Sequence, residues 1–180
     1  MRYKDSPDGI SPYTVPGQEN TLFIATSYEH DESGASNEVP EIKIQQMKKR
    51  FRKQNTFSEL ELEKKGIGYE IINPQAEKFF VTRGINRYNI QYLIKNKSER
   101  GLIILKVMHP FPPTLKDFFK THSHQIKKLI FVEMNFTGQL QQLICNECAL
   151  STPEWEEKIS HYRKYSLYPI YVEELLPLIE

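Results

Sequence analysis

The pattern of apolar and polar positions predicts an α/β domain in the second half of the chain. Three short runs are apolar at nearly every position, which is typical of strands buried on both faces of a parallel sheet. Between these runs, apolar residues recur at helical spacing. The predicted strands are residues 79–82, 102–107 and 129–132, and the predicted helices are residues 89–97, 114–119 and 139–148. Strands that alternate with helices indicate a mainly parallel sheet flanked by helices.

The ends of this domain carry weaker patterns. Residues 168–171 predict a last strand, and residues 172–179 predict a terminal helix that Pro177 interrupts. Thr114 follows two prolines and is expected to cap the helix at 114–119.

The first forty residues are rich in Pro, Gly, Ser and Asp, and residues 22–26 form their one strand candidate. Pro40 then opens a helix in which Ile44, Met47 and Phe51 recur at helical spacing, which predicts a buried face. We therefore divide the chain into an N-terminal extension with its basic helix (1–54), a linker (55–74) and the α/β domain (75–180).

Composition and charge exclude several classes of function. A formal charge of +1 gives no global field that would attract nucleic acid or an anionic membrane. No apolar run approaches the ~20 residues that span a bilayer, and the N-terminus lacks the apolar region of a signal peptide. Two cysteines cannot form a disulfide framework, which favours a cytoplasmic location.

The stretch EMNFTGQL, residues 133–140, is a candidate site because a strand there delivers polar groups to a helix N-terminus. In one interpretation, the N–H groups of residues 137–139 bind an anion or a partner beside Glu133 and Asn135. In the other, Asn135 and Thr137 cap the helix and Gly138 lets it pack closely. We favour the second, structural interpretation.

For the remaining candidate residues, we favour a structural role over a functional one. The pair Cys145 and Cys148 lies near a helix end and lacks the other ligands of a zinc site. The acidic residues at 29–32 do not have the spacing of a calcium loop. His122 and His124, and the basic run at 48–53, are interpreted as a helix-end connection and a solvated helix face. No catalytic triad, P-loop or complete dinucleotide fingerprint is present.

Five segments in order resemble the alpha subunits of 2-oxoacid:ferredoxin oxidoreductases. EMNFTGQL resembles their E-x-N-x-x-G-Q-L signature, HPFP at 109–112 resembles their Pro-Phe-Pro turn, and KYSLYPIYVEEL resembles their closing K-Y-x-G-x-P segment. DGISPYTVPG with IATSYEHDESG, and the helix MKKRFRKQ, resemble the end of the preceding pyrimidine-side domain and its connector. The resemblance gives these motif or interface positions: Pro110, Phe111, Pro112, Glu133, Asn135, Gly138, Gln139 and Leu140.

The chain departs from the family pattern at three places. Tyr13 replaces the arginine of Ser-Pro-Arg, Gly84 lacks a second glycine after the first domain strand, and Leu167 replaces the glycine of the closing phrase. The loss of the arginine removes a charge that would meet an anionic group.

The resemblance implies a piece of a larger enzyme. The complete enzymes of this family decarboxylate a 2-oxoacid on thiamine diphosphate, pass electrons to ferredoxin and form an acyl-coenzyme A. Their magnesium ion and their iron–sulfur clusters are bound by partner domains. The resemblance also implies a role in anaerobic metabolism. This chain would correspond to a transketolase C-terminal-like domain, hold no catalytic, cofactor-binding or metal-binding residue, and dock to the beta subunit and the rest of the alpha subunit. The alternative hypothesis is an independent small-molecule or nucleotide-binding module that uses the sheet edge near Gly84 and Glu133.

Overall fold

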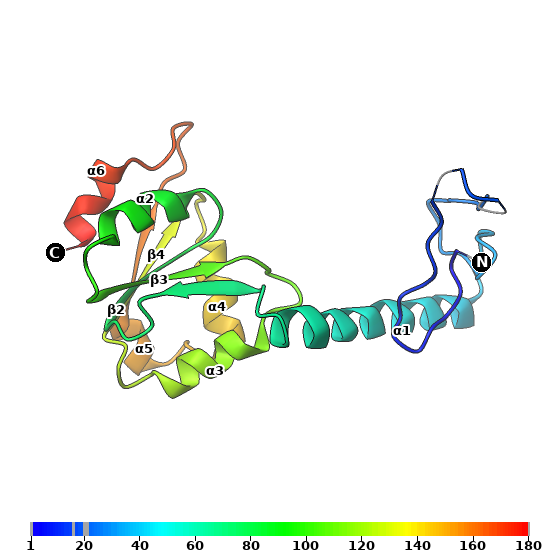
Figure 1. Cartoon of the computed structure of the whole chain (residues 1–180), viewed down its shortest axis with the longest axis horizontal. Coiled ribbons are helices and arrows are strands. Elements are labelled where there is room, and N and C mark those ends of the chain that lie inside the picture. Colours follow the sequence, from blue (N-terminus) through cyan, green and yellow to red (C-terminus); the bar gives the residue numbers. More distant parts are fainter. Residues whose placement is uncertain (1, 16, 20–21, 180) are drawn as a thin grey trace. The chain divides into compact units, whose positions relative to one another are not determined.

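The structure, a computed structural model, describes residues 2–15, 17–19 and 22–179. The chain forms two units, residues 1–60 and residues 61–180 (Figure 1). No helix in the described part of the chain is long and apolar enough to cross a membrane.

The second unit is built on a five-stranded sheet with the strand order β1-β3-β2-β4-β5. β2 pairs in parallel with β3 and β4, β4 pairs in parallel with β5, and only β1 runs antiparallel, beside β3. The strands are β1 (Tyr69–Ile72), β2 (Lys78–Thr82), β3 (Arg100–Leu105), β4 (Lys128–Glu133) and β5 (Ile159–Arg163). The predicted mainly parallel α/β sheet is therefore confirmed.

Helices cover both faces of this sheet, as Figure 1 shows. On one face lie α2 (Asn86–Ile94), α6 (Val172–Leu175) and the 3₁₀ turn η2 (Leu176–Leu178); on the other lie α3 (Pro113–Thr121), α4 (Gln139–Glu147) and α5 (Pro153–Lys158). Successive strand residues point to opposite faces, so Phe79 and Phe80 join different hydrophobic cores. Burial of each such side chain stabilises the fold by roughly 1.5–3 kcal/mol. Both cores together hold the central strands in place.

Some predicted elements are displaced or absent. The segment predicted as a linker contains β1, and neither β5 nor α5 was predicted from the sequence. Residues 168–171, predicted as a strand, have no regular structure, and the same is true of residues 22–26. Thr114 does not cap α3, because Pro112 precedes the helix and no side chain caps it. The terminal helix is interrupted near Pro177, as predicted: α6 ends at Leu175, and a 3₁₀ turn spans Leu176–Leu178.

The first unit contains the long helix α1 (Pro40–Phe57), which continues into the π-helical turn η1 (Ser58–Glu63). The prediction that Ile44, Met47 and Phe51 are buried is wrong: these side chains are exposed, Phe51 by 55%. The buried residues of α1 are instead the polar Gln46 and Lys49. The polar face of this helix is therefore the covered one.

The N-terminal segment covers that polar face through hydrogen bonds and ion pairs. Lys49 Nζ donates to the Tyr3 carbonyl at 2.6 Å, and Thr56 Oγ1 donates to the Asp8 carbonyl at 2.8 Å. The Arg50 guanidinium donates to both carboxylate oxygens of Glu29, at 3.1 and 2.6 Å. The basic run of α1 thus binds its own N-terminal segment.

The Glu29–Arg50 pair predicts a pH dependence in the first unit. The hydrogen bonds from Arg50 lower the pKa of Glu29 from 4.5 to about 2. Because the folded-state pKa is depressed, the pair stabilises the unit fully above about pH 4.5, and this contribution is lost as the pH falls towards 2. We expect the Glu29 carboxyl to titrate near pH 2 when followed by NMR, and Arg50→Met to return its pKa towards 4.5. The control Lys48→Met should leave it near 2.

Candidate functional site

Glu133, the last residue of β4, caps the N-terminus of α4. Its side chain is only 4% exposed. Oε2 accepts a hydrogen bond from Leu140 N at 2.7 Å, and Oε1 accepts one from Gln141 N at 3.0 Å. The first N–H groups of a helix have no partner within the helix, and they carry its positive partial charge. The buried carboxylate therefore takes the place that a bound anion would occupy at this helix.

Asn135 completes the turn. Its Nδ2 donates to Glu133 Oε2 at 2.7 Å, and its Oδ1 accepts from Gly138 N at 2.6 Å and from Gln139 N at 3.2 Å. The structural interpretation of this stretch is thus confirmed for Asn135. It is wrong for Thr137, whose hydroxyl does not cap α4; its carbonyl accepts a hydrogen bond from Gln142 Nε2 at 2.8 Å. The first N–H groups of α4 are occupied and are not offered to a ligand.

Gly138 is required by both its backbone and its surroundings. Its φ of +72° lies in the left-handed region, which side chains other than glycine adopt at a cost. A Cβ at this position would lie 2.7 Å from Nη2 of Arg163 in β5. The guanidinium in turn donates to Gln141 Oε1 at 2.9 Å. The glycine therefore lets α4 lie close to a side chain of the last strand.

The turn carries an exposed aromatic side chain that meets the loop after β5. Phe136 is 70% exposed, and its ring lies 5.0 Å from the ring of Tyr165 in an edge-to-face arrangement. Leu167 and Tyr168, in the same loop, are also exposed. We call these four residues the aromatic patch. This loop projects at the top of the second unit in Figure 1, and the patch joins two segments whose motifs resemble one family.

The other turn with a family motif lies between β3 and α3. Phe111 is buried in the core that includes α3 and α4, and Lys116 Nζ lies 5.5 Å from the centre of its ring. Pro112 is the residue before α3 and packs so closely on Gly68 that a Cβ there would lie 2.5 Å from its Cγ. Pro110 is partly buried and follows a cis peptide bond. These residues fix the start of α3 by packing.

A cleft of about 450 Å³ opens at the carboxyl edge of the sheet. The chain leaves β2 and β4, which are neighbours, towards helices on opposite faces of the sheet. Open α/β sheets bind ligands at such a switch point. Arg83, Gly84 and Asn86 from the β2–α2 turn line one side, and Glu133 and residues of the following turn line the other.

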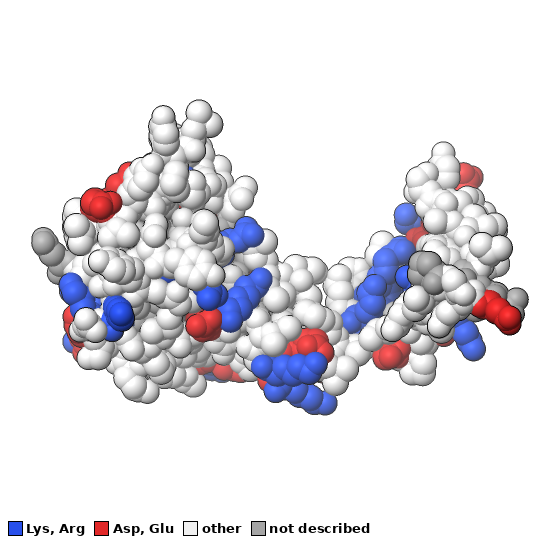
Figure 2. Space-filling view, turned by 45° about the horizontal axis from the view of Figure 1, so that its top comes forward, with Lys and Arg blue, Asp and Glu red and all other residues white. Residues whose placement is uncertain are grey.

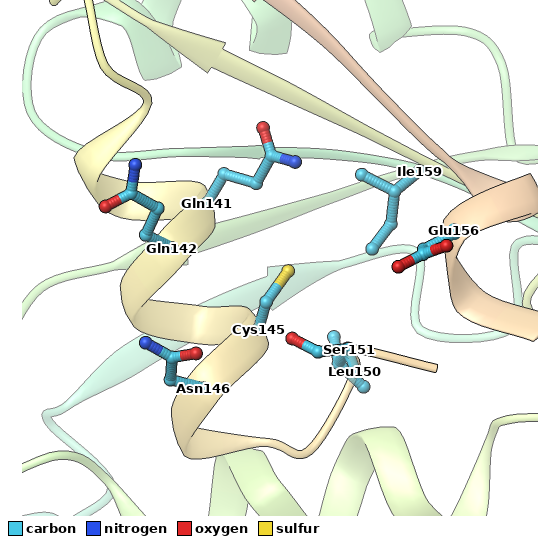
Figure 3. Close-up of a pocket in the computed structure, with 8 residues that line it drawn as sticks. All are labelled: Gln141, Gln142, Cys145, Asn146, Leu150, Ser151, Glu156 and Ile159. Carbon is cyan, nitrogen blue, oxygen red and sulfur yellow. The ribbon is translucent and has the colours of Figure 1, made fainter. Parts of the chain in front are cut away.

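A second cavity, of about 310 Å³, lies between α4 and α5. Figure 3 shows the Cys145 thiol directed into it, towards Ile159, with Gln141 and Glu156 on either side. Burial raises the pKa of Cys145 and raises that of Cys148 to about 12, so both thiols are protonated at neutral pH. A redox or metal-binding cysteine needs the thiolate. Cys145 is buried and Cys148 is partly buried, and among the described residues no third metal-binding side chain lies with them.

The other candidate groups contact their own neighbours. Glu29 binds Arg50, Asp31 accepts from Ser33, and Glu32 accepts from Asp5 N, so the acidic residues do not converge. His122 stacks on Phe118 with a centroid distance of 4.3 Å. Within the described residues, no three His, Cys, Asp or Glu side chains gather to hold a metal ion. Figure 2 shows acidic and basic side chains interspersed over the face it presents.

Comparison with known proteins finds similarity over most of the chain. The chain is 28% identical over 148 residues to the alpha subunit of 2-oxoacid:ferredoxin oxidoreductase 2 from Aeropyrum pernix, which is 79% of this chain and 22% of that protein. It superposes on 2-oxoglutarate:ferredoxin oxidoreductase from Magnetococcus marinus, solved with 2-oxoglutarate, coenzyme A and succinyl-CoA, with a TM-score of 0.67 and 27% identity. That match covers 98% of this chain and 29% of the other.

No protein-family model matches the chain. The chain spans less than a third of either relative's length. The resemblance to the alpha subunit of a 2-oxoacid:ferredoxin oxidoreductase is confirmed, and it concerns one part of that subunit.

Proposed function

We propose that the chain is the C-terminal part of a 2-oxoacid:ferredoxin oxidoreductase alpha subunit and that it supports assembly of the enzyme without catalysing the reaction itself. The observation that carries this proposal is the extent of the similarity. It covers 79% and 98% of this chain but only 22% and 29% of the two relatives. A chain that resembles one part of a larger subunit throughout its length is expected to work together with the other parts.

The complete enzyme would convert a 2-oxoacid and coenzyme A into an acyl-coenzyme A, CO₂, a proton and two electrons, which ferredoxin accepts. Thiamine diphosphate, magnesium and iron–sulfur clusters would supply this chemistry from partner domains. The described residues of this chain do not fit a metal or cluster site, because no three His, Cys, Asp or Glu side chains gather among them. We therefore assign no step of the reaction to this chain.

The aromatic patch is the surface by which we expect the α/β unit to dock. Leu167 is fully exposed and Tyr168 is 66% exposed, beside the exposed pair Phe136 and Tyr165. Aromatic side chains are enriched in the cores of protein interfaces and dominate their binding energy. The loop from Tyr165 to Tyr168 contains no charged residue that would have to be desolvated on docking.

The motif residues would present this surface. Glu133 accepts hydrogen bonds from the first turn of α4, Asn135 accepts one from Gly138 N in the turn that holds Phe136, and Gly138 gives that turn its left-handed residue. Leu140 anchors the start of α4 in the core, where it is 3% exposed, and Gln139 lies exposed beside it. The turn from Pro110 to Pro112 fixes α3 in the same way. These side chains would thus not contact the partner themselves, but would hold the loops in the conformation that docks.

Co-purification with the thiamine-binding beta subunit and the remaining part of the alpha subunit tests the proposal. We expect a single complex by size-exclusion chromatography with light scattering. The variant Phe136→Ser/Tyr165→Ser should bind about a thousandfold more weakly, because two aromatic contacts at an interface contribute roughly 2 kcal/mol each.

The matched control removes exposed apolar groups outside the patch. Ile67→Ser/Tyr92→Ser changes two exposed residues and should leave the affinity within about twofold. A chain that remains separate from both partner parts would overturn the proposed function. A complex that forms equally well with the patch variant would overturn the assignment of the docking surface.

A further inference from the structure

A pocket of about 370 Å³ in the first unit lies between α1 and the N-terminal segment. The described residues that line it include no Asp or Glu. Its positively charged side chains are Arg2, Lys49, Arg50 and Lys53. A cavity whose walls carry charges of one sign raises the local concentration of the opposite ion. The pocket therefore favours an anion.

The fold gives a counter-ion to one of these four cations. Glu29 compensates the charge of Arg50 by accepting two hydrogen bonds from its guanidinium. Arg2 Nη1 donates to the Pro12 carbonyl at 3.1 Å, and Lys53 is exposed; within the described residues neither forms an ion pair. Three positive charges that line the pocket, those of Arg2, Lys49 and Lys53, thus have no direct counter-ion in the described part of the chain.

Lys49 has unused hydrogen-bond donors although it is buried. The residue is 6% exposed, and its Nζ donates to the Tyr3 carbonyl at 2.6 Å. An ammonium group has three N–H donors, and the other two have no acceptor among the described residues. Burial lowers the pKa of Lys49; the carboxylates of Asp5 and Glu32 oppose this shift, and the charge of Lys53 adds to it. An anion in the pocket would accept the remaining donors and offset both the burial and the repulsion.

Both walls of the pocket are held in place by the chain itself. Gly9, with φ +75°, lies so close to α1 that a Cβ there would be 2.4 Å from Lys53 N and 2.6 Å from Lys49 O. The ring of Tyr3 packs on the ring of His30, which also lines the pocket, with a centroid distance of 3.8 Å. The pocket is therefore formed before a ligand binds.

Two exposed residues of the lining offer apolar surface. Ile10 is 48% exposed and Tyr13 is 75% exposed. An apolar group that packs against these side chains would remove their surface, and its own, from water. The pocket thus combines positive charge with apolar surface.

We propose that this pocket binds a small phosphate ester, with its phosphate at Arg2, Lys49 and Lys53 and its apolar part against Ile10 and Tyr13. A phosphate monoester carries about two negative charges and three acceptor oxygens near neutral pH, which matches three cations better than the single charge of a carboxylate. The volume falls within the range of small-molecule pockets. The proposal does not rest on the proposed function, because it concerns the first unit alone.

Calorimetric titration of the full chain with phenyl phosphate tests this proposal, with inorganic phosphate and benzoate as comparison probes. We expect phenyl phosphate to bind at one site and at least tenfold more tightly than either comparison, because inorganic phosphate lacks the apolar part and benzoate lacks the second charge. Lys53→Met and Arg2→Met should each weaken phenyl phosphate about tenfold, since each removes a charge-assisted hydrogen bond. The Lys53 side chain forms no hydrogen bond with any described residue, so its removal leaves the fold intact.

The matched control Lys43→Met removes the same charge from an exposed position of α1 that does not line the pocket. It should leave the affinity for phenyl phosphate within about twofold. Absence of saturable phenyl phosphate binding at millimolar concentration would overturn the proposal, and so would an equal effect of Lys53→Met and Lys43→Met. Benzoate that binds as tightly as phenyl phosphate would overturn the choice of a phosphate group. Inorganic phosphate that binds as tightly would overturn the contact with Ile10 and Tyr13.

Discussion

Replacement of Glu133 with alanine should lower the free energy of unfolding of the α/β unit by about 3 kcal/mol. Three N–H groups lose their acceptor: Leu140 N, Gln141 N and Asn135 Nδ2. Loss of a helix cap costs about 0.5–2 kcal/mol, and each unpaired buried donor adds about 1 kcal/mol or more. Because Glu133 is almost fully buried, the donors that it leaves are poorly solvated.

Urea unfolding followed by Trp155 fluorescence measures this effect. Trp155 is the single tryptophan of the chain. It lies in α5 and packs in the core against Phe119 of α3, so its emission reports the unfolding of this unit. The control Glu157→Ala removes an exposed carboxylate on α5 and should change stability by less than about 0.5 kcal/mol. If Glu133→Ala were as stable as this control, the carboxylate would not be the cap of α4 and would be free to meet a ligand.

Gly138→Ala should cost about 2 kcal/mol. A residue with a Cβ in the left-handed region costs roughly 1–2 kcal/mol. The new Cβ would also meet Arg163 at 2.7 Å and force its guanidinium away from Gln141. The Arg163–Gln141 hydrogen bond would then be lost at about 1 kcal/mol. The same urea titration measures the sum.

Gly66→Ala is a matched control for the backbone cost alone. Gly66 has a similar φ of +63°, but nothing lies within 4 Å of the position of its Cβ. The difference between the two variants therefore isolates the contact with Arg163. Equal losses in both would show that Arg163 moves aside freely and that Gly138 is needed only for its backbone.

The three central strands could be predicted from the sequence, because a strand whose two faces are both buried is apolar at nearly every position. β2, β3 and β4 follow this pattern. The helices between them could be predicted from the helical spacing of their apolar residues. β1 and β5 lie at the two edges of the sheet, and each is only partly buried along most of its length. Their sequences, YEII and ISHYR, mix polar and apolar residues and therefore do not stand out from loops.

Exposed apolar residues can have the same spacing along the chain as core residues. The helical spacing of Ile44, Met47 and Phe51 predicted burial, yet all three are exposed in the first unit. Residues 168–171 gave a strand prediction in the same way, although Tyr168 is exposed. A sequence pattern reports which residues avoid water, but it does not report whether they do so within the chain or against another protein.

At the candidate site, the sequence predicted which residues matter but not which bonds they make. Asn135 and Gly138 have the structural roles expected of a helix start. The capping role of Glu133 depends on a turn that brings its side chain back over α4, seven and eight residues later in the chain. The proximity of Phe136 to Tyr165 depends on the pairing of β4 with β5, a strand that the sequence did not indicate.

The most direct test of the central claim, that this chain is an assembly part of a 2-oxoacid:ferredoxin oxidoreductase, is an enzyme assay. Reduction of ferredoxin would be measured with coenzyme A and either 2-oxoglutarate or pyruvate, for the partner parts with and without this chain. The account predicts activity only in the mixture that contains the chain, and none from the chain alone. Reduction by the chain alone, or equal activity of the partner parts without it, would contradict the claim.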